Sequence, residues 1–81
     1  MKYVFPAVFH PESEGGYTVN FPDIEEAFTE GETVAECIEM AEDVLCLMLY
    51  ERELHGQPVP AATDIHEVVQ MPGDIVTLIK N

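Results

Sequence analysis

The chain has 81 residues, enough for one small domain, and 47% of them are hydrophobic, so it can bury a core rather than remain disordered. Its 16 acidic residues outnumber 3 Lys and Arg, which gives a formal net charge of −13 at pH 7. A polyanion of this density is repelled by phosphate, which argues against direct nucleic-acid binding and favours a basic partner. The alternative is that the acids only keep a small protein soluble.

The sequence predicts a cytoplasmic location. The apolar run at the start is broken by Pro6 and His10, and no stretch approaches the length of a signal-peptide core or a membrane span. Cys37 and Cys46 fall on opposite sides of a predicted helix and about 13 Å apart along its axis, so they are not expected to bond within one chain. Two reduced thiols fit the same location.

The first third of the chain predicts two strands. Residues 3–9 are β-branched and aromatic, and Pro6 favours an edge strand or a bulge because proline donates no ladder hydrogen bond. Polar residues and two glycines at 10–16 predict a hairpin connection. Apolar and polar residues alternate over 17–21, so one face of this second strand is expected to be buried.

The next segment predicts a short third strand and the start of the main helix. The Pro-Asp pair at 22–23 ends the second strand, and a third strand is expected near 27–30. Thr33 and Glu36 have the spacing of a capping box, in which each side chain accepts a hydrogen bond from a free amide of the first turn. The helix is therefore expected to begin after Thr33.

The predicted helix carries two apolar stripes. At about 100° per residue, the broader one should cover a sheet, and it consists of Val34, Cys37, Ile38, Ala41, Val44, Leu45, Met48 and Leu49. A narrower stripe on the far side has the spacing of a coiled-coil seam, and it consists of Met40, Leu47, Tyr50 and Leu54. Two interpretations stay open: the loop from Gln57 to His66 covers it, or it forms a partner or self-association surface in a homo-oligomer, a dimer or tetramer.

The rest of the chain predicts a helix end at Gly56, an extended Pro-containing linker, a single helical turn at 65–68 and a last strand at 75–79. The last strand has few polar breaks, as expected for a central position in the sheet. The order βββαβ predicts one α+β domain spanning residues 1–81, with one main helix packed on a small, mainly antiparallel sheet.

No group of side chains predicts catalysis. None of the acids falls in the middle of a predicted strand on its buried face, as a two-metal nuclease would need. His10, His55 and His66 lie in separate turns and are interpreted as surface residues, and Ser13 lies in an acidic loop without an activating base. We expect no enzymatic activity, no metal and no cofactor.

Several short segments occur in a particular order: Gly16-Tyr17-Thr18-Val19, Phe21-Pro22-Asp23, Thr29-Glu30-Gly31-Glu32-Thr33 and Glu36-Cys37-Ile38-Glu39-Met40-Ala41. Together with the opening strand, the prolines after Gly56 and the hydrophobic last strand, they resemble the N-terminal domain of HicB-type antitoxins over nearly the whole chain. The resemblance implies a partial ribonuclease H-like fold without nuclease activity. It also implies that the protein binds HicA, a small basic RNA-cleaving toxin, and blocks its active site.

The chain departs from this family in two places. Residues 24–27 (Ile-Glu-Glu-Ala) stand where the family commonly has a small turn with Pro and Gly, so a more acidic and differently shaped loop is expected. Many members also carry a C-terminal DNA-binding domain, whereas this chain stops at Asn81 after the last strand. A short form is therefore expected, without DNA-dependent autoregulation by this chain alone.

An acidic surface suits the RNA-binding face of a basic toxin. The residues expected to accept hydrogen bonds from its Lys and Arg side chains are Glu12, Glu14, Tyr17, Asp23, Glu25, Glu26 and Glu30. The alternative for this set is a solvated rim without a partner. The alternative function is an orphan structural domain that associates with itself through Met40, Leu47, Tyr50 and Leu54.

Overall fold

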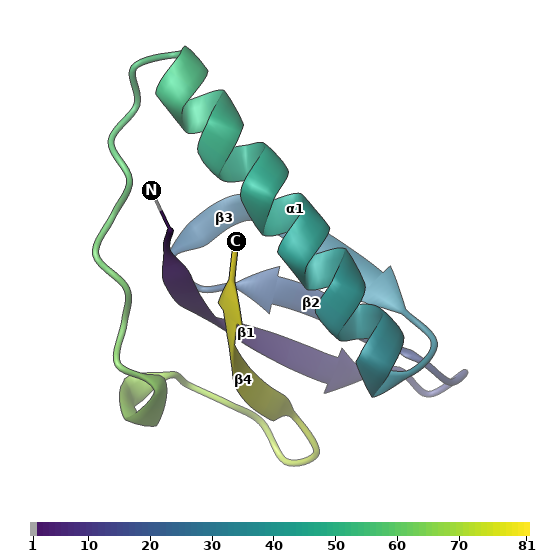
Figure 1. The fold of residues 1–81 in the computed structure, drawn as a ribbon. Helices are drawn as coiled ribbons and strands as arrows, with labels where there is room; N and C mark the ends of the chain where they lie inside the picture. The colour runs from purple at the N-terminus through teal and green to yellow at the C-terminus, as the bar shows by residue number, and fades with distance from the viewer. Residues whose placement is uncertain (1) are drawn as a thin grey trace.

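The computed structural model describes residues 2–81, which form a four-stranded sheet with one long helix across one face (Figure 1). The elements in chain order are β1 (Val4–Pro11), β2 (Tyr17–Phe21), β3 (Ile24–Gly31), α1 (Val34–Leu54), the 3-10 turn η1 (Ile65–Glu67) and β4 (Ile75–Lys80). The strand order is β3-β2-β1-β4, and all three neighbouring pairs are antiparallel. The predicted α+β fold of order βββαβ is confirmed.

The third strand is longer than predicted. It begins at Ile24 rather than near Ala27. The turn consists of Pro22-Asp23 alone, because Phe21 already pairs with Ile24. The prediction of an acidic loop at 24–27 is therefore wrong: these residues are strand, with a register shift that lets both Ile24 and Ala27 point into the core.

The last strand lies at an edge of the sheet, which corrects the prediction of a central position. Its apolar sequence has another cause. On the helix side Ile79 packs into the core and is 3% exposed. On the other side Val76 lies beside Val8, on the face where η1 contacts β4. Both faces of β4 thus meet protein although one of its edges has no neighbouring strand.

The proline in β1 does not mark an edge strand, because β1 lies between β2 and β4. Pro6 lies opposite Leu78 of β4, but the pairing of β1 with β2 starts only at Val8, opposite Asn20. At Pro6, β1 therefore has a strand neighbour on one side only. This local edge explains how a central strand accommodates a residue without an amide proton.

The helix is capped at both ends largely as predicted. The Glu36 amide donates to Thr33 Oγ1 at 3.1 Å, and the Glu36 carboxylate accepts the amide of Glu32 at 2.8 Å. The carboxylate therefore binds the residue before the cap rather than the cap itself. At the other end His55 is the C-cap, and Gly56 follows with a φ of 67°, a conformation that favours glycine.

The core lies between α1 and the sheet. The helix contributes four buried residues, each four positions after the last: Cys37, Ala41, Leu45 and Leu49. The sheet contributes mainly alternate residues of its strands: Phe5, Ala7, Phe9, Val19, Phe21, Ile24, Ala27 and Ile79. The predicted broad stripe is confirmed at its centre, whereas Val34 and Ile38 at its border are each 37% exposed.

Cys37 lies deep in this core, closer to the sheet than the helical pattern indicates. A Cβ atom on Gly31 would lie 2.9 Å from Cys37 Sγ and 3.0 Å from Cys37 N, so only glycine lets the start of α1 approach the end of β3 this closely. Burial raises the pKa of the Cys37 thiol. Cys46 is exposed, and both cysteines are free.

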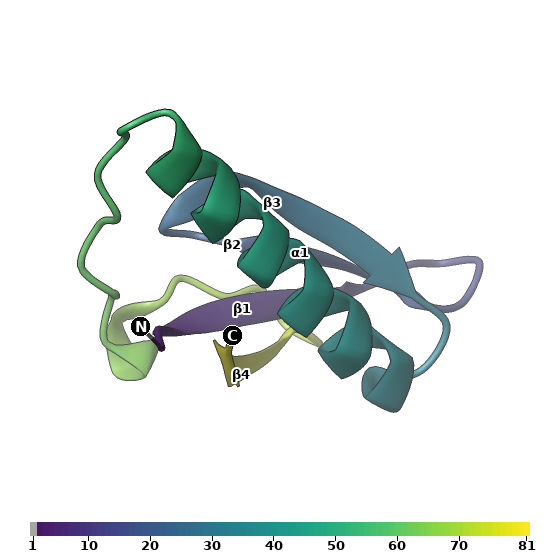
Figure 2. The same ribbon diagram turned by 45° about the horizontal axis from the view of Figure 1, so that its top comes forward.

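The segment after α1 crosses to the opposite face of the sheet. It runs past the strand ends and reaches η1, as Figures 1 and 2 show. There, Thr63 and Val68 line a hollow of about 470 Å³ together with Val8 and Asn20, whose side chains lie on the face away from α1. This route leaves the solvent side of α1 uncovered.

Candidate functional site

The described part of the chain, residues 2–81, contains no group of three or more His, Cys, Asp and Glu residues placed to hold a metal ion. No helix within these residues is both long and apolar enough to cross a membrane. The surfaces that remain to be considered are two groups of acidic residues, a histidine–aspartate contact and the solvent side of α1.

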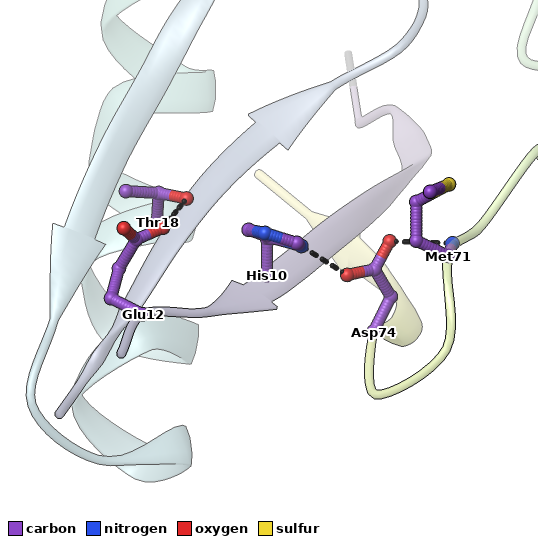
Figure 3. Close-up of polar contacts among 5 residues, drawn as sticks. All are labelled: His10, Glu12, Thr18, Met71 and Asp74. Carbon is purple, nitrogen blue, oxygen red and sulfur yellow. Dashed lines mark hydrogen bonds and ion pairs between the residues drawn. The ribbon is translucent and has the colours of Figure 1, made fainter. Parts of the chain in front are cut away.

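The hairpin end of the sheet carries the first acidic group, which we call the acidic rim and define as Glu12, Glu14, Glu30 and Glu32. These residues line one hollow of about 520 Å³, together with Thr18 and the β1–β2 loop. Thr18 donates a hydrogen bond to Glu12 at 3.1 Å (Figure 3) and lies opposite Glu30 in the sheet. The strand pairing thus gathers carboxylates that are far apart in the sequence.

Glu32 belongs to the acidic rim but was missing from the predicted set. Glu32 lies near the other rim residues because the β1–β2 loop packs against the connection between β3 and α1. A Cβ atom on Gly16 would lie 2.9 Å from the carbonyl oxygen of Gly31 and 3.5 Å from Glu32 Cα. The Gly-Gly pair at 15–16 was the available signal, since it marks a close approach of two backbones.

Three other residues of the predicted set, Asp23, Glu25 and Glu26, lie at the opposite end of β3 or in the turn before it. Glu25 and Glu30 are separated by about 17 Å along the strand at the usual rise per residue. The predicted set is therefore not one surface. Tyr17 is set apart as well, because its half-buried side chain packs against the core.

Two of these separate acids are already bound within the chain. The Asp23 carboxylate accepts the amide of Thr63 at 2.9 Å and its hydroxyl at 2.6 Å. Arg52 donates two hydrogen bonds to Glu26, from Nε at 2.6 Å and from Nη2 at 2.9 Å, and a third to the carbonyl oxygen of Pro58. The hydrogen bonds that Arg52 donates to Glu26 lower the pKa of Glu26 and raise the pKa of Arg52.

A further contact between side chains involves His10, which lies at the surface as predicted but in a strand rather than in a turn. His10 lies in β1, and its Nδ1 is 2.5 Å from Asp74 Oδ1, in the turn before β4 (Figure 3). Asp74 Oδ2 accepts the amide of Met71 at 2.9 Å. The hydrogen bond to Asp74 raises the pKa of His10, while the Met71 amide and then His10 lower the pKa of Asp74.

The solvent side of α1 carries the narrow apolar stripe, which we call the outer stripe. Its members are exposed by 40% at Met40, 52% at Leu47, 60% at Tyr50 and 62% at Leu54. Of the two interpretations left open, coverage of the outer stripe by residues 57–66 does not hold for the single chain, because this segment crosses to the other face of the sheet. The outer stripe remains available for a partner.

A family described as "HicB_like antitoxin of bacterial toxin-antitoxin system" matches residues 5–80. The chain belongs to the HicB-like antitoxin family. Antitoxin HicB of Escherichia coli K12 is 36% identical over 78 residues, which cover 93% of this chain and 56% of that protein. Antitoxin HicB 1 of Photorhabdus laumondii is 54% identical over 41 residues, covering 51% of this chain and 26% of the relative. The chain thus spans about half the length of the Escherichia coli relative.

Solved structures of HicB-like antitoxins share the fold. A chain of a "HicA3 and HicB3 toxin-antitoxin complex" matches with a TM-score of 0.76 and 25% identity, over 95% of each chain. The N-terminal domain of Burkholderia pseudomallei antitoxin HicB gives a TM-score of 0.80 at 23% identity, again over 95% of each chain. A toxin-antitoxin complex from Streptococcus pneumoniae gives 0.86 at 20% identity, over 99% of this chain and 69% of that chain. The predicted family and fold are both confirmed.

Proposed function

We propose that this protein is a non-catalytic antitoxin that binds a small, basic, RNA-cleaving HicA-type toxin and blocks its active site. The observation that carries the proposal is membership in the HicB-like antitoxin family, with a match over 95% of this chain to a chain of a HicA3–HicB3 complex. The net charge of −13 supports a basic partner. The two proteins would meet in the cytoplasm.

We place the toxin contact at the acidic rim. Within residues 2–81, Glu26 is the one acid in an ion pair with a Lys or Arg side chain, so the rim carboxylates have no cationic neighbour of their own. Lys and Arg side chains of a basic toxin would supply charge-assisted hydrogen bonds there. Asp23 and Glu26 are engaged within the chain, which makes them poorer acceptors than the rim residues Glu12 and Glu30.

The proposal is tested by expressing this protein together with a HicA-type toxin from the same genome and measuring growth, followed by titration calorimetry of the purified pair. The wild type should restore growth. The double charge reversal Glu12→Lys with Glu30→Lys should weaken binding at least about tenfold, a loss of about 1.4 kcal/mol. Added salt should weaken the wild-type complex, since it screens the attraction.

The matched control is Glu39→Lys with Glu42→Lys, which makes the same change of net charge on exposed positions of α1. It should change the affinity by less than about threefold, because the long-range attraction is largely screened beyond about 10 Å. Equal losses for both double variants would assign the effect to net charge and exclude the acidic rim. A stable wild type that neither binds nor rescues would refute the antitoxin function.

A second candidate function is self-association through the outer stripe, with or without a toxin. The observation in its favour is the exposure of four apolar side chains in coiled-coil spacing. Replacement of Leu47 by Glu should then yield a monomer in sedimentation velocity. An oligomer that persists in Leu47→Glu excludes this surface.

A further inference from the structure

The segment between α1 and the turn before β4, residues 57–73, is attached to the rest of the fold at few points (Figure 1). We call it the strap. None of its residues is buried, although Val59, Thr63 and Val68 are half-buried. Its backbone-to-backbone hydrogen bonds within the described chain form its own turns or join it to the adjoining residues, and none reaches a strand. The strap therefore lacks most of the burial and hydrogen bonding that hold α1 and the sheet together.

One side-chain contact fastens the middle of the strap. The Asp23 carboxylate accepts the amide of Thr63 at 2.9 Å and its hydroxyl at 2.6 Å, and we call this contact the latch. The other side-chain contacts lie near the two ends: Arg52 donates to the carbonyl oxygen of Pro58, and the Met71 amide donates to an aspartate beside β4. Among the described residues, the latch alone ties positions 59–70 to the sheet by side-chain hydrogen bonds.

The strap covers part of the sheet face that α1 does not reach. Val8 alternates along β1 with Ala7 and Phe9, which belong to the core under the helix, so Val8 points to the other side. It is nevertheless only 6% exposed. Thr63 and Val68 of the strap line the same hollow as Val8, and η1 contacts the neighbouring strand β4. Opening of the strap would expose this side of the sheet without removing any fully buried core residue.

We propose that the strap opens as a unit of its own while α1 and the four strands stay folded, and that the latch between Asp23 and Thr63 controls this opening. The strap then regulates access to the face of the sheet around Val8. Both ends of the open strap remain joined to folded elements, so closing costs only the entropy of one loop with fixed ends.

The position of Asp23 suits it to this role. Asp23 lies in the two-residue turn between β2 and β3, and the flanking residues Phe21 and Ile24 pair with each other and are buried. Its carboxylate is therefore held in place by the sheet, whereas Thr63 lies in a segment without regular structure. Hydrogen bonds to a charged group are stronger than neutral ones, so loss of the carboxylate should raise the open population at least about tenfold.

The test is thiol labelling of the full chain with a neutral pyridyl disulfide, a probe that the net charge of −13 does not repel. Val8→Cys, combined with Cys46→Ser, places one thiol under the strap. The native Cys37 is fully buried between α1 and the sheet and reports opening of the core. Labelling at position 8 should be nearly independent of urea at low concentrations, whereas labelling of Cys37 should accelerate with urea, because only core opening exposes much surface.

Asp23→Ala in this background should accelerate labelling at position 8 at least about tenfold and that of Cys37 less than about threefold. Thr63→Val keeps the amide and removes only the hydroxyl, so it should give a smaller acceleration. The two changes together should add nothing to Asp23→Ala, since they remove the same contact. Glu25→Ala is the matched control, because it removes the same charge from an exposed residue of β3 close to the turn. It should change labelling at position 8 less than about threefold.

Three results would overturn the proposal. An equal dependence on urea at position 8 and at Cys37 would mean that the whole domain opens together. An equal acceleration of both thiols by Asp23→Ala and by Thr63→Val would mean that the latch supports the core rather than the strap. Equal effects of Glu25→Ala and Asp23→Ala would assign the change to charge alone. All three are measured on the isolated chain, so none depends on toxin binding.

Discussion

The two edges of the sheet are built differently although both are single strands next to solvent. β3 carries Glu25, Glu26 and Glu30 and lies under α1, with which it makes the most extensive helix contact of any strand. β4 is uncharged over 75–79 and contacts the helix less. One edge strand of the sheet thus carries three carboxylates, whereas residues 75–79 of the other edge strand carry no charge.

Each edge is also tied to the rest of the fold by one ion pair. Arg52 of α1 binds Glu26 of β3, and His10 of β1 binds Asp74 just before β4. The first pair joins an edge strand to the helix, and the second joins the turn before an edge strand to the sheet. Three measurements separate the contributions of core burial and of these two pairs.

The largest effect is expected inside β4. Replacement of Ile79, which is 3% exposed, by Ala should lower the free energy of unfolding by about 2–4 kcal/mol, because it leaves a cavity between α1 and β1. Urea denaturation followed by circular dichroism at low protein concentration measures this. Its neighbour Leu78, half exposed, is the control, and Leu78→Ala should cost less than about 1 kcal/mol. Similar costs for the two variants would mean that β4 is not part of the core.

An intermediate effect is expected on the β3 side. A double-mutant cycle with Glu26→Gln and Arg52→Gln should give a coupling energy of about 0.5–1 kcal/mol at neutral pH, since both side chains are partly exposed to water. The pKa of Glu26 is lowered in the folded protein, so this coupling is present above the ordinary pKa of a glutamate and is lost as the pH falls through the lowered value. A coupling energy of zero at neutral pH would show that the contact between Glu26 and Arg52 does not stabilise the folded protein.

The smallest effect is expected at the turn before β4, and it depends on pH. The pKa of His10 is raised and that of Asp74 is lowered in the folded protein. The stabilisation from His10 is full below the ordinary pKa of a histidine, about 6.5, and is lost as the pH rises through the raised value. The stabilisation from Asp74 is present above the ordinary pKa of an aspartate, about 3.9, and is lost as the pH falls through the lowered pKa of Asp74.

The pair should therefore stabilise the fold most between about pH 4 and pH 6.5. The difference in melting temperature between the wild type and His10→Gln should be largest near pH 5 and should shrink by pH 8. His66→Gln, at an exposed position of η1, serves as the control and should show no such maximum. A difference for His10→Gln that stays constant from pH 5 to pH 8 would contradict the assignment.

Features that depend on residues close together in the sequence were predicted correctly. Features that depend on which strands pair with each other were not. The Thr33 cap, the alternation over 17–21 and the Gly56 helix end depend on neighbours within a few residues, and all three are confirmed. The position of β4 depends on which strands pair and on what lies against its second face, and the apolar pattern of 75–79 is compatible with either a central or a covered edge strand. The predicted family is confirmed because it rests on the order of many short segments.

The predicted acidic residues lie in two separate places because their positions also depend on long-range strand pairing. Sequence spacing places Glu25 and Glu30 close together, but along a strand they are about 17 Å apart. Glu12 and Glu30 are distant in sequence, and the pairing of Thr18 with Glu30 brings them to one hollow. Only the register between β1, β2 and β3 carries this information.

The position of β1 has a consequence for how the chain folds during synthesis. β1 leaves the ribosome before the other three strands, and it pairs with β2 through a short hairpin. Its other partner is β4, the last of the four strands in chain order, so that Phe5 reaches Ile79 only after all the elements between them have been synthesised. Contacts between residues this far apart in sequence form late and slowly. Until residue 80 has emerged, β1 exposes the edge that β4 will occupy, and the nascent chain is most open to aggregation at its oldest strand.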